Sequence, residues 1–277
     1  MGRPEPARRL VVNADDFGRS HSINHAVVRA HLEGILTTAS LMVNEPGCEE
    51  AVTLARENPR LGVGLHLSLL CGRSALSPGE IPGLVNDRGE FSGQPVATGF
   101  RYFARRGLRG QLRAEIHAQL ERFRATGLAL DHVNGHLHLH LHPVIFPMLM
   151  AEAGAFGIRH VRLTREPFWL NARLASGHWG YRASHALIYR CLSAHARPEL
   201  DRRGIRHTAR VFGLLQNARV DEAYLARLLP SLPPGDSELY SHPSLDEFKH
   251  EFDALISPRV TGLVRQLGVQ LVRYRDL

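Results

Sequence analysis

Short apolar segments alternate with amphipathic ones along most of this 277-residue chain. This alternation is typical of a parallel sheet covered by helices, because each parallel strand pair needs a crossover connection. About eight strands, without an internal repeat or a linker, predict a single α/β domain with barrel-like closure. Strands are expected near residues 9–13, 37–44, 62–70, 129–134, 157–163, 208–215, 238–241 and 269–274.

Two long segments interrupt the alternation and are interpreted as insertions in this domain. Residues 71–108 accumulate Gly, Pro and Ser. So long an irregular stretch in a compact domain is usually functional, often a lid or rim of a site. Residues 164–205 mix aromatic side chains with arginine and should be partly helical. They fit either an amphipathic helix packed on the core or a basic, aromatic rim that handles an apolar or membrane-resident substrate.

The charge balance indicates which classes of partner the protein could bind. The chain carries 34 Lys and Arg against 27 Asp and Glu, a net charge of +7, but almost all the positive charge is scattered arginine. No nucleic-acid partner is therefore expected, whereas a peripheral contact with anionic lipid headgroups stays open. Three unpaired cysteines, and no secretory signal or long apolar run, favour a cytoplasmic protein, with the inner membrane surface as an alternative location.

The densest cluster of functional side chains is the run D-H-V-N-G-H-L-H-L-H-L-H-P at residues 131–143. An extended conformation would place all its histidines and Asn134 on one side and the leucines on the other. Residues two apart on a strand lie about 6.6 Å apart, and residues six apart about 20 Å, so only one or two imidazoles can share an ion. A histidine-rich surface tract that chelates metals loosely is the alternative.

Polar residues also follow other predicted strands at their carboxyl ends. Asp15 and Asp16 follow the first strand, and His66 lies in the second half of the third. His136 follows the fourth strand, and His242 follows the seventh. Each has an ordinary explanation alone: a helix cap, a core histidine or a turn residue. Because the carboxyl ends of parallel strands meet at one edge, four such segments together favour a common site.

One carboxylate and two neutral imidazoles suit a catalytic divalent ion, since they leave positions open for water and a substrate oxygen. Adjacent carboxylates at a turn can point in different directions, so one can bind the ion while the other acts as a base. Such ligands suit zinc or magnesium and also accept manganese or cobalt. A metal-dependent phosphoesterase would need more bridging carboxylates, and a non-catalytic metal-binding protein would leave Asp15 and His242 without a role.

These motifs resemble the YdjC family of carbohydrate deacetylases, which includes chitooligosaccharide deacetylases. The matching segments are V-N-A-D-D-F-G at 12–18, G-L-H at 64–66, G-H-L-H-L-H at 135–140 and S-H-P at 241–243. The resemblance covers nearly the whole chain. It implies a distorted (β/α) barrel, one divalent metal ion and removal of acetyl groups from N-acetylated sugars.

Transferred residue by residue, the resemblance implies metal ligation by Asp16, His66 and His136. It also implies Asp15 as the general base and His242 as a candidate acid.

Three further residues of the histidine-rich run are assigned supporting roles. His138 and His140 are expected to line the pocket or to hold the ligands in place. Asn134 belongs with them, although relatives commonly have D-S-H where this chain has Asn134-Gly135-His136. The amide keeps the hydrogen bonding of the carboxylate but loses its charge.

The overall sequence, including residues 164–205, also resembles the branch of the family associated with hopanoid biosynthesis. That likeness implies an acetylated amino sugar attached to a polycyclic lipid. A chitooligosaccharide or another soluble amino sugar is the alternative substrate.

Overall fold

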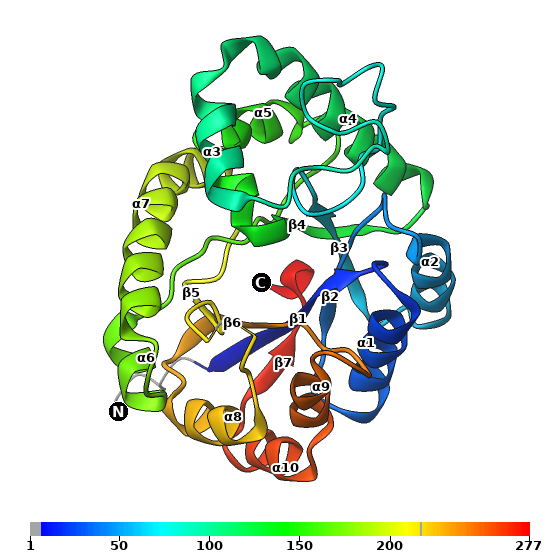
Figure 1. The fold of residues 1–277 in the computed structure, drawn as a ribbon. Coiled ribbons are helices and arrows are strands. Elements are labelled where there is room, and N and C mark those ends of the chain that lie inside the picture. The colour runs from blue at the N-terminus through cyan, green and yellow to red at the C-terminus, as the bar shows by residue number, and fades with distance from the viewer. Residues whose placement is uncertain (1–6, 217) are drawn as a thin grey trace.

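The structure is a computed structural model that describes residues 7–216 and 218–277. Its centre is a seven-stranded sheet with the order β4-β3-β2-β1-β6-β5, and β7 also pairs with β1. Every strand pair is parallel, and the sheet curls into a half-barrel (Figure 1). The strands are β1 (Arg8–Phe17), β2 (Thr38–Leu41), β3 (Gly62–Leu67), β4 (Leu130–Gly135), β5 (Arg210–Phe212), β6 (Gly235–Ser241) and β7 (Gln270–Val272).

Helices surround this sheet on its outer side, with α7 at the left of Figure 1 and α1 and α2 at the right. Four short 3-10 helices are η1 (Arg106–Leu108), η2 (His136–Leu141), η3 (Leu229–Ser231) and η4 (Tyr274–Asp276). The α-helices are α1 (His21–Glu33), α2 (Cys48–Glu57), α3 (Pro95–Ala104), α4 (Arg109–Ala125), α5 (Ile145–Glu152), α6 (Phe168–Leu174), α7 (Trp179–Arg203), α8 (Glu222–Leu228), α9 (Lys249–Ile256) and α10 (Pro258–Gln266).

An extended segment, residues 159–165, lies between the outermost strands β4 and β5. On the β4 side the backbone N of Val133 donates to the carbonyl of His160 at 2.9 Å. On the β5 side the backbone N of Val211 donates to the carbonyl of Arg165 at 2.9 Å. The expected strand at 157–163 therefore forms isolated bridges rather than a regular ladder, but these bridges complete the curl of the sheet. The predicted α/β fold with a distorted barrel is confirmed.

The prediction that residues 131–143 are extended throughout is wrong. Strand β4 ends at Gly135, and the chain turns into η2, where Leu137 (φ 47°) and His138 (φ 59°) are left-handed. A Cβ atom on Gly135 would lie 3.0 Å from Cβ of His140, so the chain folds back closely at this glycine. The alternation of faces therefore stops before most of the histidines, and they point in different directions.

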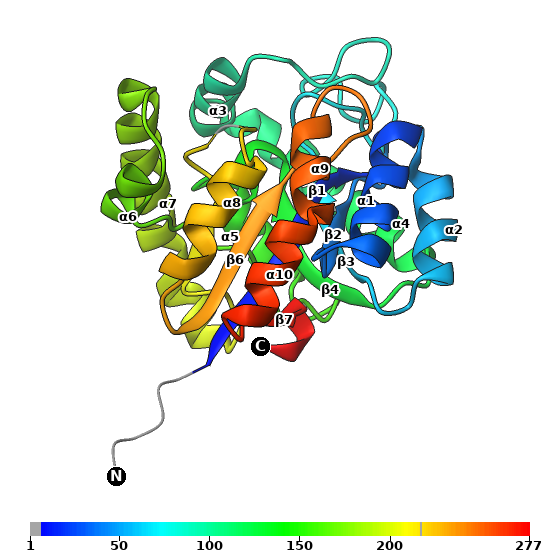
Figure 2. The same cartoon turned by 90° about the horizontal axis from the view of Figure 1, so that it is seen from below.

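The two long segments predicted as insertions lie in different parts of the domain: α3, in the first, lies above the carboxyl ends of the strands (Figure 2), whereas α7, in the second, runs along the flank of the sheet (Figure 1). The prediction that residues 71–108 are irregular throughout is wrong for their second part, because α3 and η1 lie there. Residues 71–94 form two isolated antiparallel bridges before α3 begins. The buried carboxylate of Glu115 on α4 accepts hydrogen bonds from the backbone of Ala75 and Leu76, at 2.7 and 3.0 Å. Residues 164–205 hold α6 and the 25-residue α7, so the prediction that this segment is partly helical is confirmed.

The C-terminal segment lies under the amino ends of the strands, opposite the carboxyl edge (Figure 2). Tyr274 is fully buried, stacks on His132 with ring centroids 4.4 Å apart, and donates its hydroxyl proton to Glu238. Arg275 Nε donates to Asp131 Oδ1 at 2.7 Å. These contacts tie the end of the chain to β4 and β6.

Among the described residues, no helix combines the length and the apolar character needed to cross a membrane.

The contact between β3 and β4 yields a stability prediction. A Cβ atom on Gly64 would lie 2.4 Å from the carbonyl oxygen of His132, so Gly64→Ala must push the two strands apart. We expect a loss of about 1–3 kcal/mol in the free energy of unfolding, measured by thermal or urea denaturation. The matched control is Gly110→Ala on α4, where a Cβ meets no neighbour within 4 Å and should leave stability unchanged or slightly raised. Equal stability of the two variants would contradict the packing described for Gly64.

Candidate active site

The two aspartates after β1 occupy an irregularity in the strand. The register between β1 and β2 shifts between Ala14 and Phe17, and Asp16 adopts a left-handed conformation with φ 63°. A bulge of this kind re-aims consecutive side chains. Gly18 follows with φ 92°, and a Cβ there would lie 2.9 Å from Leu41 Cδ1, which explains the glycine of the N-A-D-D-F-G motif.

The structure brings together the three side chains predicted as metal ligands. Asp16 Oδ1 lies 3.0 Å from His136 Nδ1 and 3.3 Å from His66 Nε2. The two imidazole nitrogens are also 3.3 Å apart. In a tetrahedral zinc site, bonds of about 2.0–2.1 Å separate neighbouring donor atoms by about 3.3 Å. This triangle therefore matches one face of a coordination shell, and the donor set fits a divalent ion.

Hydrogen bonding fixes which nitrogen of His66 faces the triangle. His66 Nδ1 lies 2.7 Å from Asn134 Oδ1, an atom that can only accept, so Nδ1 carries the proton and Nε2 presents its lone pair. Burial alone would lower the pKa of His136, but the carboxylate of Asp16 outweighs it and raises that pKa to about 10. The position between these side chains thus favours positive charge.

Asp15 lies beside the triangle without joining it and is almost completely hydrogen-bonded. Its Oδ1 accepts from Asn13, Asn134 and Arg162 at 2.8, 3.0 and 2.9 Å. Its Oδ2 accepts from Arg162 Nη1 at 2.6 Å. Burial opposes the charged form, but the positive charge of Arg162 prevails and holds the pKa of Asp15 well below its usual range. Asp15 is therefore an ionised carboxylate, 4.0 Å from His66 Nδ1.

Sequence reasoning missed Arg162 and Glu238, which hold Asp15 in place. Arg162 is fully buried and donates from Nε to Glu238 Oε1 at 2.8 Å, as well as to both oxygens of Asp15. A buried charge is costly unless it is paired and hydrogen-bonded. The sequence carries a partial signal, because Arg162 lies in one expected strand, at 157–163, and Glu238 opens another, at 238–241, with the opposite charge.

His138 and His140 lie beside the site without joining the triangle. His140 is buried, and its Nε2 donates to the carbonyl of Arg162 at 2.9 Å. His138 packs edge-on against Tyr189 of α7 and Tyr240 of β6, with ring centroids 5.2 and 5.4 Å apart. Burial and the nearby charge of Arg162 lower the pKa of His138 well below its usual value, so this imidazole is neutral.

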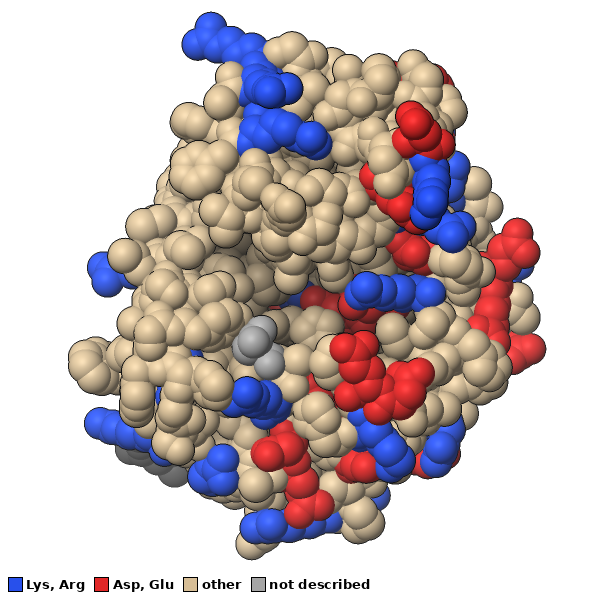
Figure 3. All heavy atoms as spheres, in the orientation of Figure 1, with Lys and Arg blue, Asp and Glu red and all other residues tan. Residues whose placement is uncertain are grey.

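His242 follows β6 and is half-buried at the rim. Its backbone N donates to Glu251 Oε2 at 2.5 Å, and its Nδ1 lies 3.8 Å from the same oxygen. A positive charge on His242 is one of the causes that lower the pKa of Asp15, so the two side chains interact electrostatically. Among the described residues, no hydrogen bond joins His242 to Asp15 directly. Figure 3 shows a hollow near the centre of this face, with carboxylate atoms visible inside it.

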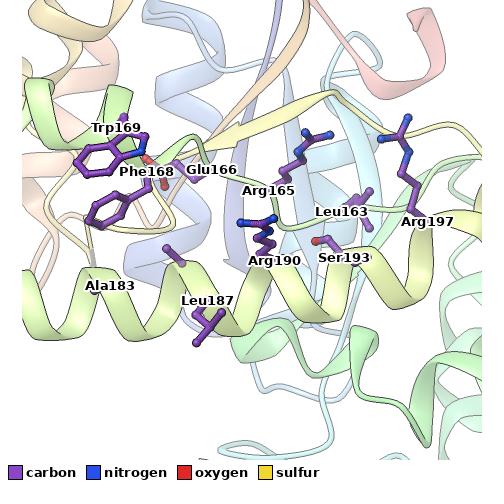
Figure 4. A pocket seen from close by; sticks show the side chains of 12 residues that line it. Leu163, Arg165, Glu166, Phe168, Trp169, Ala183, Leu187, Arg190, Ser193 and Arg197 are labelled. Atoms are coloured by element: carbon purple, nitrogen blue, oxygen red, sulfur yellow. The ribbon is translucent and has the colours of Figure 1, made fainter.

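A groove of about 700 Å³ lies between α7 and residues 163–169. Figure 4 shows aromatic side chains at one end of the groove and arginines along the rest. Its lining includes Phe168, Trp169, Leu187, Arg165, Arg190 and Arg197.

The family follows from a match over most of the chain. Residues 9–266 match the family model described as YdjC-like protein. The chain belongs to the YdjC-like family. The family resemblance stated from the sequence is thereby confirmed.

Individual relatives of this YdjC-like protein agree with that assignment. A carbohydrate deacetylase of Mus musculus is 33% identical over 98% of this chain and 96% of its own. A carbohydrate deacetylase of Geobacillus stearothermophilus is 42% identical over 57% of this chain, and the match spans only 62% of that relative. The crystal structure of a candidate cellobiose-phosphate cleavage protein of Enterococcus faecalis V583 covers 98% of both chains with a TM-score of 0.75 and 19% identity, which shows the shared fold.

The bond between His66 and Asn134 gives a test of the site. In Asn134→Ala, His66 Nδ1 loses its acceptor, and loss of such a partner typically weakens metal affinity about 10- to 100-fold. We expect that decrease in zinc affinity, measured by competition with a chromophoric chelator. Asn86→Ala, in the 71–94 segment, is the control and should bind as tightly as the unmodified protein. Equal affinity in both variants would show that Asn134 does not orient a ligand.

Proposed function

We propose that this YdjC-like protein is a metal-dependent carbohydrate N-deacetylase that cleaves the acetamide of an N-acetylglucosamine-type sugar. The proposal rests on one arrangement, the triangle of Asp16, His66 and His136 beside the ionised carboxylate of Asp15. The names of the matched relatives, which are carbohydrate deacetylases, support the same reaction. The donor set suits zinc and also accepts magnesium, manganese or cobalt.

When bound by the three ligands, a divalent ion would polarise the acetyl carbonyl and acidify a water molecule. Asp15 is the base in this proposal. Its Oδ2 accepts a single hydrogen bond, from Arg162, and so keeps a lone pair for the proton of the attacking water. Arg162 holds the carboxylate in one orientation and keeps it ionised, so that it is able to take a proton.

The leaving amine needs a proton, because it is too basic to depart as an anion. His242 is the candidate acid, since it lies at the rim within electrostatic reach of Asp15. Glu251 Oε2 lies 3.8 Å from Nδ1 of His242, beside the ring. His138, neutral and packed between two tyrosines, would line the pocket.

The base assignment is tested by Asp15→Asn. We expect the rate of acetate release from N-acetylglucosamine oligomers to fall about 10²- to 10⁴-fold, while the bound metal is retained, because the amide cannot take a proton. Acetate is measured enzymatically, and metal by mass spectrometry. Asp253→Asn, whose carboxylate pairs only with Lys249 on the surface of α9, is the control. Full activity in Asp15→Asn would reject the base, and loss of metal would show a structural role instead.

For the substrate, we propose an acetylated amino sugar attached to an apolar lipid of the hopanoid type, as the branch resemblance suggests. Apolar side chains exposed near the carboxyl edge support this: Phe100 (73%) and Phe103 (62%) on α3 and Leu137 (52%) beside His136. Figure 2 shows α3 rising above the carboxyl ends of the strands. Such a surface is unusual for a protein that binds only soluble sugar. This substrate would bring the protein to the inner surface of a membrane. A chitooligosaccharide is the alternative.

The two substrate classes are separated by the double variant Phe100→Ser/Phe103→Ser. We expect a several-fold higher KM for an N-acetylglucosamine conjugate of an apolar lipid and an unchanged KM for a soluble chitooligosaccharide, because only the lipid would contact these rings. Leu32→Ser, on α1 and 61% exposed, is the matched control. An unchanged KM for both substrates would favour the soluble amino sugar.

A further inference from the structure

A second cluster of metal-binding side chains lies on the surface of α1 and α2, outside the candidate active site. His21 Nδ1 lies 2.6 Å from Glu50 Oε1, and His25 Nε2 lies 3.3 Å from the same oxygen. The two imidazole rings have centroids 4.1 Å apart. One donor atom from each residue lies within 4.8 Å of the other two. The cluster thus repeats the two imidazoles and one carboxylate of the buried triangle.

The helix geometry explains why these donors converge. Residues four apart on a helix lie on the same face, so His21 and His25 present their rings side by side toward α2. Two such histidines together with a carboxylate from another element are a recurrent zinc ligand set. Hydrogen bonds from Asn24 and His21 outweigh the opposing effect of burial and lower the pKa of Glu50, which keeps the carboxylate charged.

We propose that His21, His25 and Glu50 form a second divalent-ion site, which takes zinc with water completing the coordination shell. The distance from His25 Nε2 to Glu50 Oε1 already equals the donor separation of about 3.3 Å expected for tetrahedral zinc. His21 has to withdraw from Glu50 by about 0.7 Å to reach that separation. Its side chain is 74% exposed, which leaves room on the solvent side for the movement.

Asn24 connects this surface site to the loop that carries Asp16. Its buried side chain donates to Glu50 Oε2 at 2.7 Å and to the carbonyl of Gly47 at 2.9 Å. Its Oδ1 accepts from the backbone N of Gly18 at 2.8 Å. An ion held by residues of both helices would fasten α1 to α2 at the point where Asn24 supports the turn after β1. The expected role is therefore structural and independent of the proposed deacetylase activity.

The test is zinc stoichiometry of the full chain, measured by equilibrium dialysis and mass spectrometry, with cobalt absorption as a second report of coordination. We expect two zinc ions per unmodified chain and one in His25→Ala and in Glu50→Gln. The glutamine retains an oxygen that can accept from Asn24 but removes the charge. His195→Ala, an exposed histidine of α7, is the control and should bind two. Raising zinc above one equivalent should increase the melting temperature of the unmodified chain and of the control only.

The outcomes separate this site from the proposed active site. If the unmodified chain binds only one zinc ion, and His25→Ala and Glu50→Gln bind one as well, that ion lies elsewhere and the proposal is overturned. Two ions in those variants overturn it as well. A single ion that both substitutions abolish supports the surface site, and it is then the metal dependence of the proposed deacetylase that fails.

Discussion

The buried guanidinium of Arg162 is the interaction on which both the fold and the site depend. It pairs with Asp15 of β1 and Glu238 of β6 in a region that excludes water, where removing one partner would leave an uncompensated charge. Because Arg162 lies in the segment that closes the curl between β4 and β5, these bonds fasten the closure to the sheet. Tyr274 extends the network to the C-terminus through Glu238. Barrel closure and the orientation of Asp15 thus have a common cause.

At the carboxyl edge, several residues have backbone conformations that residues other than glycine rarely adopt. Asp16, Leu137 and His138 are left-handed, and all three lie in the two turns that flank the triangle. Such conformations cost about 1–3 kcal/mol each and persist only where surrounding contacts fix them. Between the two turns, Asn134 binds His66, Asp15 and Ser40. The amide of Asn134 therefore connects the ligand side of the site to Asp15 without adding a negative charge.

The sequence predicted the convergence of Asp16, His66 and His136 because it depends only on topology: parallel strands end at one edge. It did not predict the Arg162–Glu238 pair, whose members are 76 residues apart and meet only after the sheet has curled. The face assignment for the histidine-rich run was wrong because alternation assumes an extended chain. The chain stops being extended at Gly135, which the sequence analysis treated only as one residue of a motif. The regular strand expected at 157–163 is replaced by isolated bridges, one from Val161 to Val133 of β4 and one from His160 to Arg206, which lies outside the named strands.

The two clusters of two histidines and a carboxylate show that a donor set alone does not make an active site. The cluster on α1 and α2 is open to solvent, and no second carboxylate in the described chain is fixed beside it in the way that Arg162 fixes Asp15. The triangle at the carboxyl edge is buried, so charges within it interact through a low dielectric and are worth more than at the surface. If both bind an ion as proposed, the buried one also has the ionised carboxylate of Asp15, the proposed base, beside it. What the fold adds to the ligands is therefore the ionised neighbour and the exclusion of water, and both come from the closure of the sheet around Arg162.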